Sequence, residues 1–428
     1  MKRKELIIKV VAETCRLLLG AVFVFSGIVK AVDPMGFEIK MGEYLSAWGI
    51  EGYEMTIALA AFNLIAIEFT IGVCLLLGVY RRYTSMMALA LMAFMTPLTL
   101  YVAIFNPVTD CGCFGDAIVI SNQATFFKNI VLLAAACFVY AKHDKLLSCF
   151  TTRTRWFVPL FAYFSCLSFA YWNYNHLPLI DFRPYKVGVN IPEQMAIPEG
   201  APVDEYRYSF VYEKDGVKKT FSLEDYPQND PSWTFVESHT ELLKKGYTPP
   251  IAAFNIFDPE GNDVTDLILE HEGEVFLLIA AHIEDANDEC AGNISNLYDY
   301  AERHGIPFYC VTGSSAEAAE DWIAHTGAEY PFLEADETLL KTIIRSNPGL
   351  VLIDNGTILR KWHYNDMPEE EDIIRLTSLS PEEEDTSRER QAGIYISLSA
   401  FTIPLLLVWI YDLALFRRRK NTPEKEAE

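Results

Sequence analysis

Long, nearly uncharged runs of apolar residues dominate the first 172 positions of the chain and return near its end. A helix that crosses a bilayer needs about 20 consecutive apolar residues, so runs of this kind predict transmembrane helices. The loop expected at residues 35–53 carries Phe, Tyr and Trp, which are common at membrane interfaces. Six spans are expected, at residues 10–32, 55–77, 84–105, 125–140, 156–172 and 393–416.

The pattern changes between residues 174 and 378, where short apolar runs alternate with polar segments. Residues 174–248 are rich in Pro and Tyr and predict an extended linker with a small β element, a hairpin that turns at Asp215-Gly216. Beyond Pro250 the pattern predicts an α/β domain that ends in a hairpin with an Asn355-Gly356 turn. Its strands are expected at residues 275–281, 307–312, 350–354 and 357–363, and its helices at 287–304, 315–326 and 337–344.

Basic residues indicate how the chain is oriented in the membrane. They cluster at the N-terminus, at Arg81-Arg82, at residues 142–155 and at residues 417–420. Because cytoplasmic loops carry an excess of Lys and Arg, six spans place both termini in the cytoplasm and residues 174–392 outside. This predicts a multi-pass protein of the inner membrane with a periplasmic domain. A signal peptide is the alternative for the first run, but that run is long and lacks a small-x-small cleavage site.

Acidic residues are concentrated in the part expected outside. Residues 173–392 carry 43 acidic and 16 basic side chains, a net charge of −27, whereas the remainder sums to about +4. Phosphate recognition requires basic surface, so nucleic acid is excluded as a partner. The expected partners are the lipid bilayer and an outward-facing thiol protein.

The chemistry is concentrated in the motif Asp110-Cys111-Gly112-Cys113-Phe114-Gly115-Asp116, between the third and fourth spans. Gly112 and Gly115 tolerate positive φ and allow a tight turn at the two thiols. A disulfide between cysteines one residue apart joins Cα atoms at the short end of the permitted separation, so it is strained. Strained, exposed disulfides are labile, which suits thiol-disulfide exchange with a partner. A structural disulfide, free thiols in a turn and a metal half-site are the alternatives, although the ligand spacing of zinc sites is not met and no metal is expected.

Cysteines 290 and 310 are the other two thiols on the predicted outer side. Cys290 precedes a predicted helix, whose dipole would lower its thiol pKa, but Asp285, Asp288 and Glu289 would raise it. Cys310 lies in a buried-looking strand. A reactive Cys290, a Cys290–Cys310 disulfide and a domain that only binds all remain open.

Ionisable residues inside the predicted spans form a second set of candidates. Glu68 lies near the middle of the second span, where a charge is costly and indicates a function such as a proton relay. A buried partner such as Arg16 or Lys30 would explain Glu68 structurally instead, and Glu13 with Arg16 reads as an interfacial pair. No cofactor is evident, and no span carries a pattern that could be assigned to a quinone or haem site.

Two family resemblances follow from these motifs. The run Arg16-Leu-Leu-Leu-Gly-Ala-Val-Phe-Val-Phe-Ser-Gly-Ile-Val-Lys-Ala-Val-Asp-Pro34, with Asp110-Cys-Gly-Cys-Phe-Gly115, resembles the DoxX/MauE family over about residues 8–145. That resemblance implies a four-helix membrane unit associated with thiol and quinone redox chemistry, in which Cys111 and Cys113 are the candidate redox pair. MauE itself is implicated in disulfide formation during maturation of a periplasmic enzyme.

The second resemblance, over about residues 249–378, is to membrane-anchored periplasmic thioredoxin-like proteins. Strand, helix, strand, helix and hairpin is their order of elements, and Asn347-Pro348-Gly349 matches the position of their cis-proline. The segment from His282 to Cys290 lacks their Cys-x-x-Cys, so this domain departs from the usual thioredoxin reaction.

The sequence therefore predicts a polytopic α-helical membrane protein with an outward thioredoxin-like domain, and two functions remain open. One is a thiol-disulfide oxidoreductase component in which Cys111 and Cys113 exchange a disulfide with a partner that the outward domain docks. The other is a non-catalytic envelope scaffold with a degenerate thioredoxin-like binding module. The expected units are a four-helix membrane domain (1–145), a fifth span (146–173), the linker (174–248), the thioredoxin-like domain (249–378), an acidic linker (379–392), a sixth span (393–416) and a cytoplasmic tail (417–428).

Overall fold

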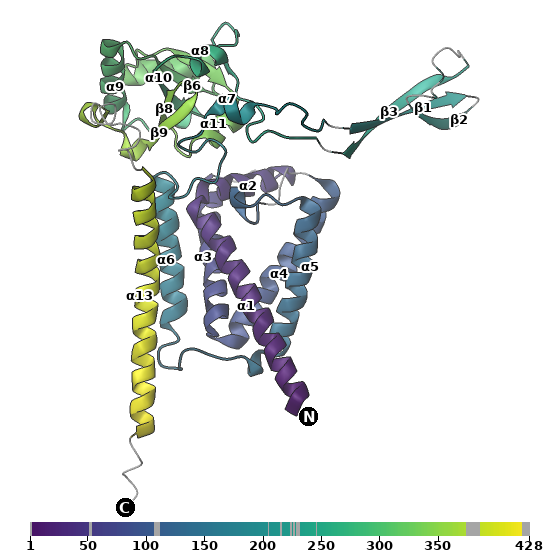
Figure 1. Ribbon diagram of the computed structural model, residues 1–428, viewed down its shortest axis with the longest axis vertical. Coiled ribbons are helices and arrows are strands. Elements are labelled where there is room, and N and C mark those ends of the chain that lie inside the picture. The colour runs from purple at the N-terminus through teal and green to yellow at the C-terminus, as the bar shows by residue number, and fades with distance from the viewer. Residues whose placement is uncertain are drawn as a thin grey trace, which may run out of the picture.

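The computed structural model describes residues 2–50, 54–106, 112–203, 205–214, 216–222, 225, 227, 232–244, 246–373 and 386–421. Asp110 and Cys111 lie outside these ranges. A bundle of long helices carries an α/β domain over one end, and a small sheet projects sideways from that domain (Figure 1).

Long helices match the predicted spans. Among the described residues, five are long and apolar enough to cross a membrane, and they correspond to the first four predicted spans and the last. The helix at the fifth predicted span has a C-terminal half rich in Tyr, Trp and Asn and does not reach that apolarity, so its role as a span stays a prediction. It packs along α3 and contacts α13. The six helices are α1 (Lys2–Val32), α3 (Glu54–Leu77), α4 (Arg81–Phe105), α5 (Asn122–Ala141), α6 (Phe157–Asn175) and α13 (Thr386–Asn421).

Glycines allow α1 and α3 to pack closely. A Cβ at Gly72 would lie 2.6 Å from the backbone nitrogen of Val24, and one at Gly27 would lie 2.8 Å from the Phe69 Cβ. Small residues of this kind let the backbones of membrane helices approach each other. The α1–α3 pair is therefore fixed by shape as well as by apolarity.

The prediction of a loop at residues 35–53 is wrong for most of that range. Residues 34–47 form a helix, α2 (Pro34–Ala47), which lies across the end of the bundle (Figure 1). Asp33 caps it by accepting a hydrogen bond from the Gly36 amide at 2.9 Å, and Pro34 stands at its first position. A capping Asp followed by Pro is a standard helix start. The same two residues end α1 and begin α2.

The α/β domain contains a six-stranded sheet in the order β4-β7-β6-β5-β8-β9. β5 runs parallel to β6 and β6 parallel to β7, whereas β4, β8 and β9 pair in antiparallel fashion. This arrangement confirms the thioredoxin-like fold, and the Asn347–Pro348 bond is cis at the position implied by the resemblance. The strands are β4 (Ile256–Phe257), β5 (Glu274–Ala280), β6 (Phe308–Thr312), β7 (Phe332–Ala335), β8 (Gly349–Asp354) and β9 (Thr357–His363), and the helices are α8 (Thr265–Leu269), α9 (Ala291–His304), α10 (Ala316–Thr326) and α11 (Glu337–Ile343).

Two apolar cores cover the two faces of this sheet, because successive residues of β5 point to opposite sides. Val275, Leu277 and Ile279 pack with α8 and α11, whereas Phe276 and Leu278 pack with α9 and α10.

Part of the predicted linker belongs to the first of these cores, so the linker expectation is wrong there. Tyr185 and Ile191 are buried in that core, and the Ile191 amide donates to the carbonyl of Gly356 at 2.8 Å. Ile191 also begins a short helix, α7 (Ile191–Met195). Scattered single apolar residues in a proline-rich segment carry no periodic signal, which is why this packing was not predicted.

The projecting sheet has the order β2-β1-β3, with β1 (Glu205–Lys214), β2 (Val217–Ser222) and β3 (Thr234–Lys244). Lys214 pairs with Val217, which confirms the predicted hairpin around Asp215-Gly216. The third strand was not expected.

Candidate functional site: the Cys-Gly-Cys loop and the cavity beside it

The described part of the Cys-Gly-Cys loop is a tight turn, as its glycines predict. Gly112 and Gly115 have φ values of +64° and +49°, and the Gly115 amide donates to the Gly112 carbonyl at 3.2 Å. Ser26 on α1 donates from its hydroxyl to the carbonyl of Cys113 at 2.7 Å. The backbone at Cys113 is thereby fixed against α1.

Phe114 anchors the same loop. Its ring is buried and meets Phe25 of α1 edge to face, with centroids 5.4 Å apart, and the Lys128 ammonium of α5 lies 4.0 Å from its centroid. Aromatic pairs and cation–π contacts of this geometry each stabilise by roughly 0.5–2 kcal/mol. Phe114 therefore holds the Cys-Gly-Cys loop in place against α1 and α5.

A cavity of about 650 Å³ lies between this loop and the thioredoxin-like domain. Gly112, Gly115 and Asp116 of the loop line it, and so do α2 from the bundle and α11 from the thioredoxin-like domain. The segment at residues 178–184, which follows α6, also contributes to the wall. Three distant parts of the chain thus meet beside the predicted redox motif.

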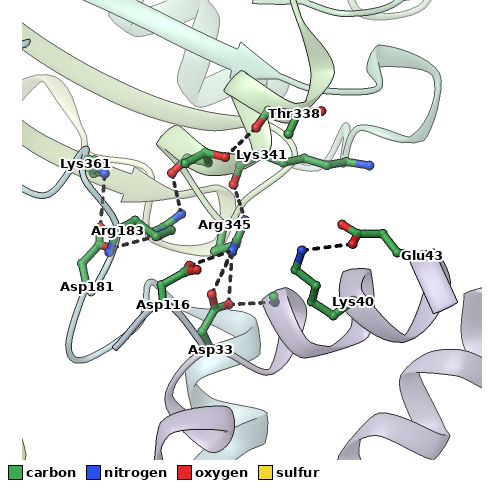
Figure 2. Close-up of polar contacts among 12 residues, drawn as sticks. Asp33, Lys40, Glu43, Asp116, Asp181, Arg183, Thr338, Lys341, Arg345 and Lys361 are labelled. Carbon is green, nitrogen blue, oxygen red and sulfur yellow. Dashed lines mark hydrogen bonds and ion pairs between the residues drawn. The ribbon is translucent and has the colours of Figure 1, made fainter. Parts of the chain in front are cut away.

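Arg345 joins the two sides of the cavity (Figure 2). Its Nε lies 3.1 Å from both carboxylate oxygens of Asp33, its Nη2 lies 3.0 Å from Asp33 Oδ2, and Asp116 lies 3.7 Å away. Burial opposes the charged form of Asp33, but Arg345 and Arg183 outweigh it and lower the pKa of that carboxyl. We call Arg345, Asp33 and Asp116 the clasp, since they connect the thioredoxin-like domain, α2 and the Cys-Gly-Cys loop.

A second ion-pair group lies beside the clasp (Figure 2). Arg183 contacts Asp181 through Nε at 2.8 Å and Nη2 at 3.0 Å, and Lys361 of β9 donates to the same carboxylate at 3.2 Å and to the Ile343 carbonyl at 2.6 Å. Burial and the neighbouring Arg183 lower the pKa of Lys361 to about 7. Burial raises the pKa of Asp181, but Arg183 and Lys361 outweigh it and bring it to about 2.

Cys290 and Cys310 lie in the core of the thioredoxin-like domain, away from the clasp. Both are free, so the alternative of a Cys290–Cys310 disulfide is wrong. Burial, with smaller contributions from Asp288 and Glu289, raises the pKa of the Cys290 thiol to about 11, and its Sγ donates to the Asn287 carbonyl at 3.3 Å. Burial also raises the pKa of Cys310. A reactive role for Cys290 stays a prediction, and a thiol of raised pKa is a poor nucleophile at neutral pH.

The segment from His282 to Cys290, which lacks Cys-x-x-Cys, begins with a group of polar contacts at His282. His282 Nε2 lies 3.0 Å from Glu337 and 3.1 Å from the Lys341 ammonium, and Lys341 also pairs with Glu337. The Asn347 side chain, beside the cis bond to Pro348, donates to the His282 carbonyl at 2.6 Å. The Asn287 amide also donates to the Asn347 carbonyl at 3.0 Å, so the loop before Pro348 is in contact with the segment from His282 to Cys290.

Residues 8–142 match the family model described as methylamine utilisation protein MauE. These residues form a MauE-family domain. The match covers less than half of the chain, and the DoxX side of the predicted resemblance stays a prediction. Residues 206–245, which cover the projecting sheet except its first residue, match a model described as a domain of unknown function, DUF8463.

No curated protein matches the chain. A solution structure from Bacteroides thetaiotaomicron, described as a candidate protein disulfide isomerase, is 19% identical to it. That similarity covers 29% of this chain and 81% of the other, with a TM-score of 0.24. The thioredoxin-like fold is assigned here from the order and direction of the strands.

The ionisable residues predicted within the MauE-family domain are paired. Lys30 Nζ lies 2.7 Å from Glu68 Oε2, and Arg16 Nη2 lies 2.6 Å from Glu13 and also donates through Nη1 to the Leu75 and Leu76 carbonyls. Lys30 is thus the buried partner that explains Glu68 structurally. Lys30 also lines the cavity, so this pair lies at the side of the cavity that faces the bundle.

Arg345, Asp33, Arg183 and Lys361 were not among the predicted site residues. Arg345 and Asp33 are 312 positions apart, and no local pattern connects them. The sequence signal available for Asp33 was the pair Asp33-Pro34, which is typical of a helix start and indicates a capping role for this aspartate.

Proposed function

We propose that this protein is a redox protein of the cell envelope in which Cys111 and Cys113 exchange a disulfide with a thiol partner. A membrane redox-related role is supported by the MauE-family domain and by the thioredoxin-like fold. The observation that carries the finer proposal is the cavity, which brings Gly112, Gly115 and Asp116 beside a face of the thioredoxin-like domain. That domain holds the partner next to the loop.

The arrangement of the chain supports the proposed topology. The N-terminal end of α1 and the C-terminal end of α13 lie at one end of the bundle, and the thioredoxin-like domain lies at the other (Figure 1). With both termini in the cytoplasm, as the basic loops predict, the loop and this domain face the periplasm. That compartment permits disulfides.

The exchange is a two-electron step that balances without a further reactant. A partner thiolate attacks one sulfur of the Cys111–Cys113 disulfide, which forms a mixed disulfide and releases the other cysteine as a thiolate. A second partner thiolate then attacks the mixed disulfide. The partner leaves oxidised to a disulfide, and Cys111 and Cys113 are left reduced.

The experiment is thiol trapping in intact cells followed by mass spectrometry, on wild type and on Cys111→Ser and Cys113→Ser variants. A pair that changes between disulfide and dithiol with the redox poise, or a mixed disulfide trapped by one single-Cys variant, is the expected result. Cys149→Ser is the control, because Cys149 is an exposed thiol outside the spans, in the loop between α5 and α6. If Cys111 and Cys113 keep one redox state whatever the poise, the exchange proposal fails.

The scaffold function is the second candidate, and one observation favours it for the thioredoxin-like domain itself. Cys290 and Cys310 are buried with raised thiol pKa values. This supports a domain that binds rather than one that reacts. Inert behaviour of Cys111 and Cys113 in the trapping experiment would extend that role to the whole protein.

A further inference from the structure

Besides the clasp, the Arg183–Asp181 pair and Lys30, two facing walls of the cavity each carry a lysine paired with a glutamate. On α2, Lys40 lies 3.0 Å from Glu43, and on α11, Lys341 pairs with Glu337 one helical turn away. Lys40 and Glu43 rise from the bundle side, while Lys341 extends from the opposite side of the gap (Figure 2). The Lys40 and Lys341 side chains are 23% and 31% exposed, so a ligand in the cavity can reach both.

This charge pattern selects for a ligand that carries both signs. A bound carboxylate can accept hydrogen bonds from a lysine, and a bound ammonium group can donate to the glutamate beside it. Each lysine is paired with the glutamate of its own wall, so a ligand with both signs can replace both halves of such a pair. A ligand with one sign alone would displace one half and leave the other without compensation, which costs free energy in a partly desolvated site. Hydrogen bonds to charged groups are also the stronger ones.

The α2 wall lies directly against the Cys-Gly-Cys loop. A Cβ built at Gly112 would lie 3.3 Å from Lys40 Cγ, so the missing side chain leaves room where the loop meets this lysine. Val119, Ile180 and Phe182 supply apolar surface around the same space. A ligand bound to Lys40 therefore lies next to the loop that contains Cys113.

The size of the cavity indicates a small ligand. Its volume of about 650 Å³ lies within the range of small-molecule sites, roughly 300–1,000 Å³. The clasp joins the bundle to the thioredoxin-like domain at this cavity, and Arg345 and Asp33 form part of its lining.

We propose that this cavity binds a small zwitterionic thiol or disulfide, between a single cysteine and a cysteine-containing tripeptide in size. The lysines of α2 and α11 hold its carboxylates, and Glu43 and Glu337 hold its ammonium group. The inference rests on the proposed function, since it names the substrate class for exchange at Cys111 and Cys113. It replaces the expected protein partner with a small molecule.

The test measures binding apart from exchange. The probe is γ-glutamyl-seryl-glycine, the tripeptide glutathione with its thiol replaced by a hydroxyl, titrated by calorimetry into the full chain in lipid nanodiscs. We expect saturable binding that weakens about tenfold or more in a Lys40→Ala/Lys341→Ala variant, since it loses two charged hydrogen-bond donors. A Lys218→Ala/Lys219→Ala variant is the matched control, because it removes two lysines from β2 of the projecting sheet, far from the cavity.

A second measurement on the wild type does not depend on how the variants fold. The tripeptide with an acetylated amino group keeps its size and its carboxylates but loses its positive charge, and we expect it to bind several-fold more weakly. Equal binding of the two tripeptides, equal binding by wild type and the cavity variant, or no binding by wild type would each overturn the inference.

The two proposals fail in different ways. If the seryl tripeptide binds in the cavity but Cys111 and Cys113 keep one redox state whatever the redox poise, the binding site stands and the exchange function fails. If the cysteines exchange only with a trapped protein and no tripeptide binds, the exchange function stands and the small-ligand site is overturned.

Discussion

Replacing Arg345 with Met should release the thioredoxin-like domain from the membrane bundle. The substitution keeps the length and apolar stem of the side chain but removes the guanidinium group that contacts Asp33 and Asp116. Asp33 then keeps the Gly36 amide as a hydrogen-bond donor but has lost the cation nearest to it.

The expected size of the effect follows from burial. Arg345 and Asp33 have side chains that are only 10% and 20% exposed, so they behave as a buried pair. Removing one partner of such a pair costs about 3–5 kcal/mol. Because water can reach Asp33 in part, we expect about 3 kcal/mol, which is roughly a hundredfold change in the equilibrium between docked and undocked domain.

Hydrogen–deuterium exchange on the purified full chain would measure this release. In the Arg345→Met protein, protection should fall in the first turn of α2 and in α11, while α9, on the other face of the sheet, keeps its wild-type protection. Arg303→Met is the control, since Arg303 pairs with Glu370 at 2.8 Å but their side chains are 56% and 38% exposed. Exposed pairs of this kind contribute about 0–1 kcal/mol.

Two results would refute the reasoning about the clasp. One is wild-type protection of α2 and α11 in the Arg345→Met protein, and the other is loss of protection in α9 as well, which would mean unfolding rather than undocking. A double variant Asp33→Asn/Arg345→Met provides a further check. It should cost no more than Arg345→Met alone, because no unpaired charge is left buried.

Three further predictions test other parts of the structure. The clasp should hold above about pH 4 and weaken as the pH falls further. Burial opposes the charged form of Asp33, but Arg345 and Arg183 outweigh burial and lower the pKa of this carboxyl, so it stays charged down to low pH. Limited proteolysis between pH 3 and pH 6 would measure the weakening, and weakening already at pH 6 would contradict the expectation. The free energy of unfolding should rise with pH between about 7 and 10, by at most about 1.4 kcal/mol per pH unit. The reason is that the pKa of Lys361 is about 7 in the folded protein and near 10 in the unfolded chain, so only the unfolded chain binds this proton in that range. Denaturation of a Lys361→Met protein should lack this slope. Gly78→Ala should lower thermal stability far more than Gly188→Ala. Both glycines have positive φ, but only at Gly78 would the new Cβ overlap a neighbouring atom, the carbonyl oxygen of Leu147. Equal melting temperatures of the two variants in detergent would contradict this packing.

Local patterns were sufficient for most of the fold. The membrane helices were predicted because apolarity over some 20 residues is a property of each segment alone. The hairpins at Asp215-Gly216 and Asn355-Gly356 were predicted for the same reason, since the turn residues lie between the strands that they connect.

The errors have a common physical cause. α2 carries apolar and charged residues on an interfacial helix, so its pattern resembles a loop more than a span. Ile191 and Tyr185 are single apolar residues that fill the core of a domain beginning some 60 positions later. β7 is short and lies within the sheet, where its neighbours determine that it is a strand.

The candidate site was predicted only in the loop, where Gly112 and Gly115 take the positive φ that their spacing indicated. Cys111 lies outside the described residues, so the redox pair stays a prediction. The clasp could not be predicted, because its energy arises between charges from separate segments and depends on a fold that no single segment encodes.

The thioredoxin-like domain is inserted between two helices that touch each other. The chain enters it from α6 and returns through α13, whose Phe401 stacks on Phe161 with centroids 5.7 Å apart. Such a double tether makes docking on the loop an intramolecular event, with an effective concentration in the millimolar range for short connections. A separate domain without these tethers would have to reach comparable concentrations to contact the loop as often, so dilution does not remove the thioredoxin-like domain from the loop.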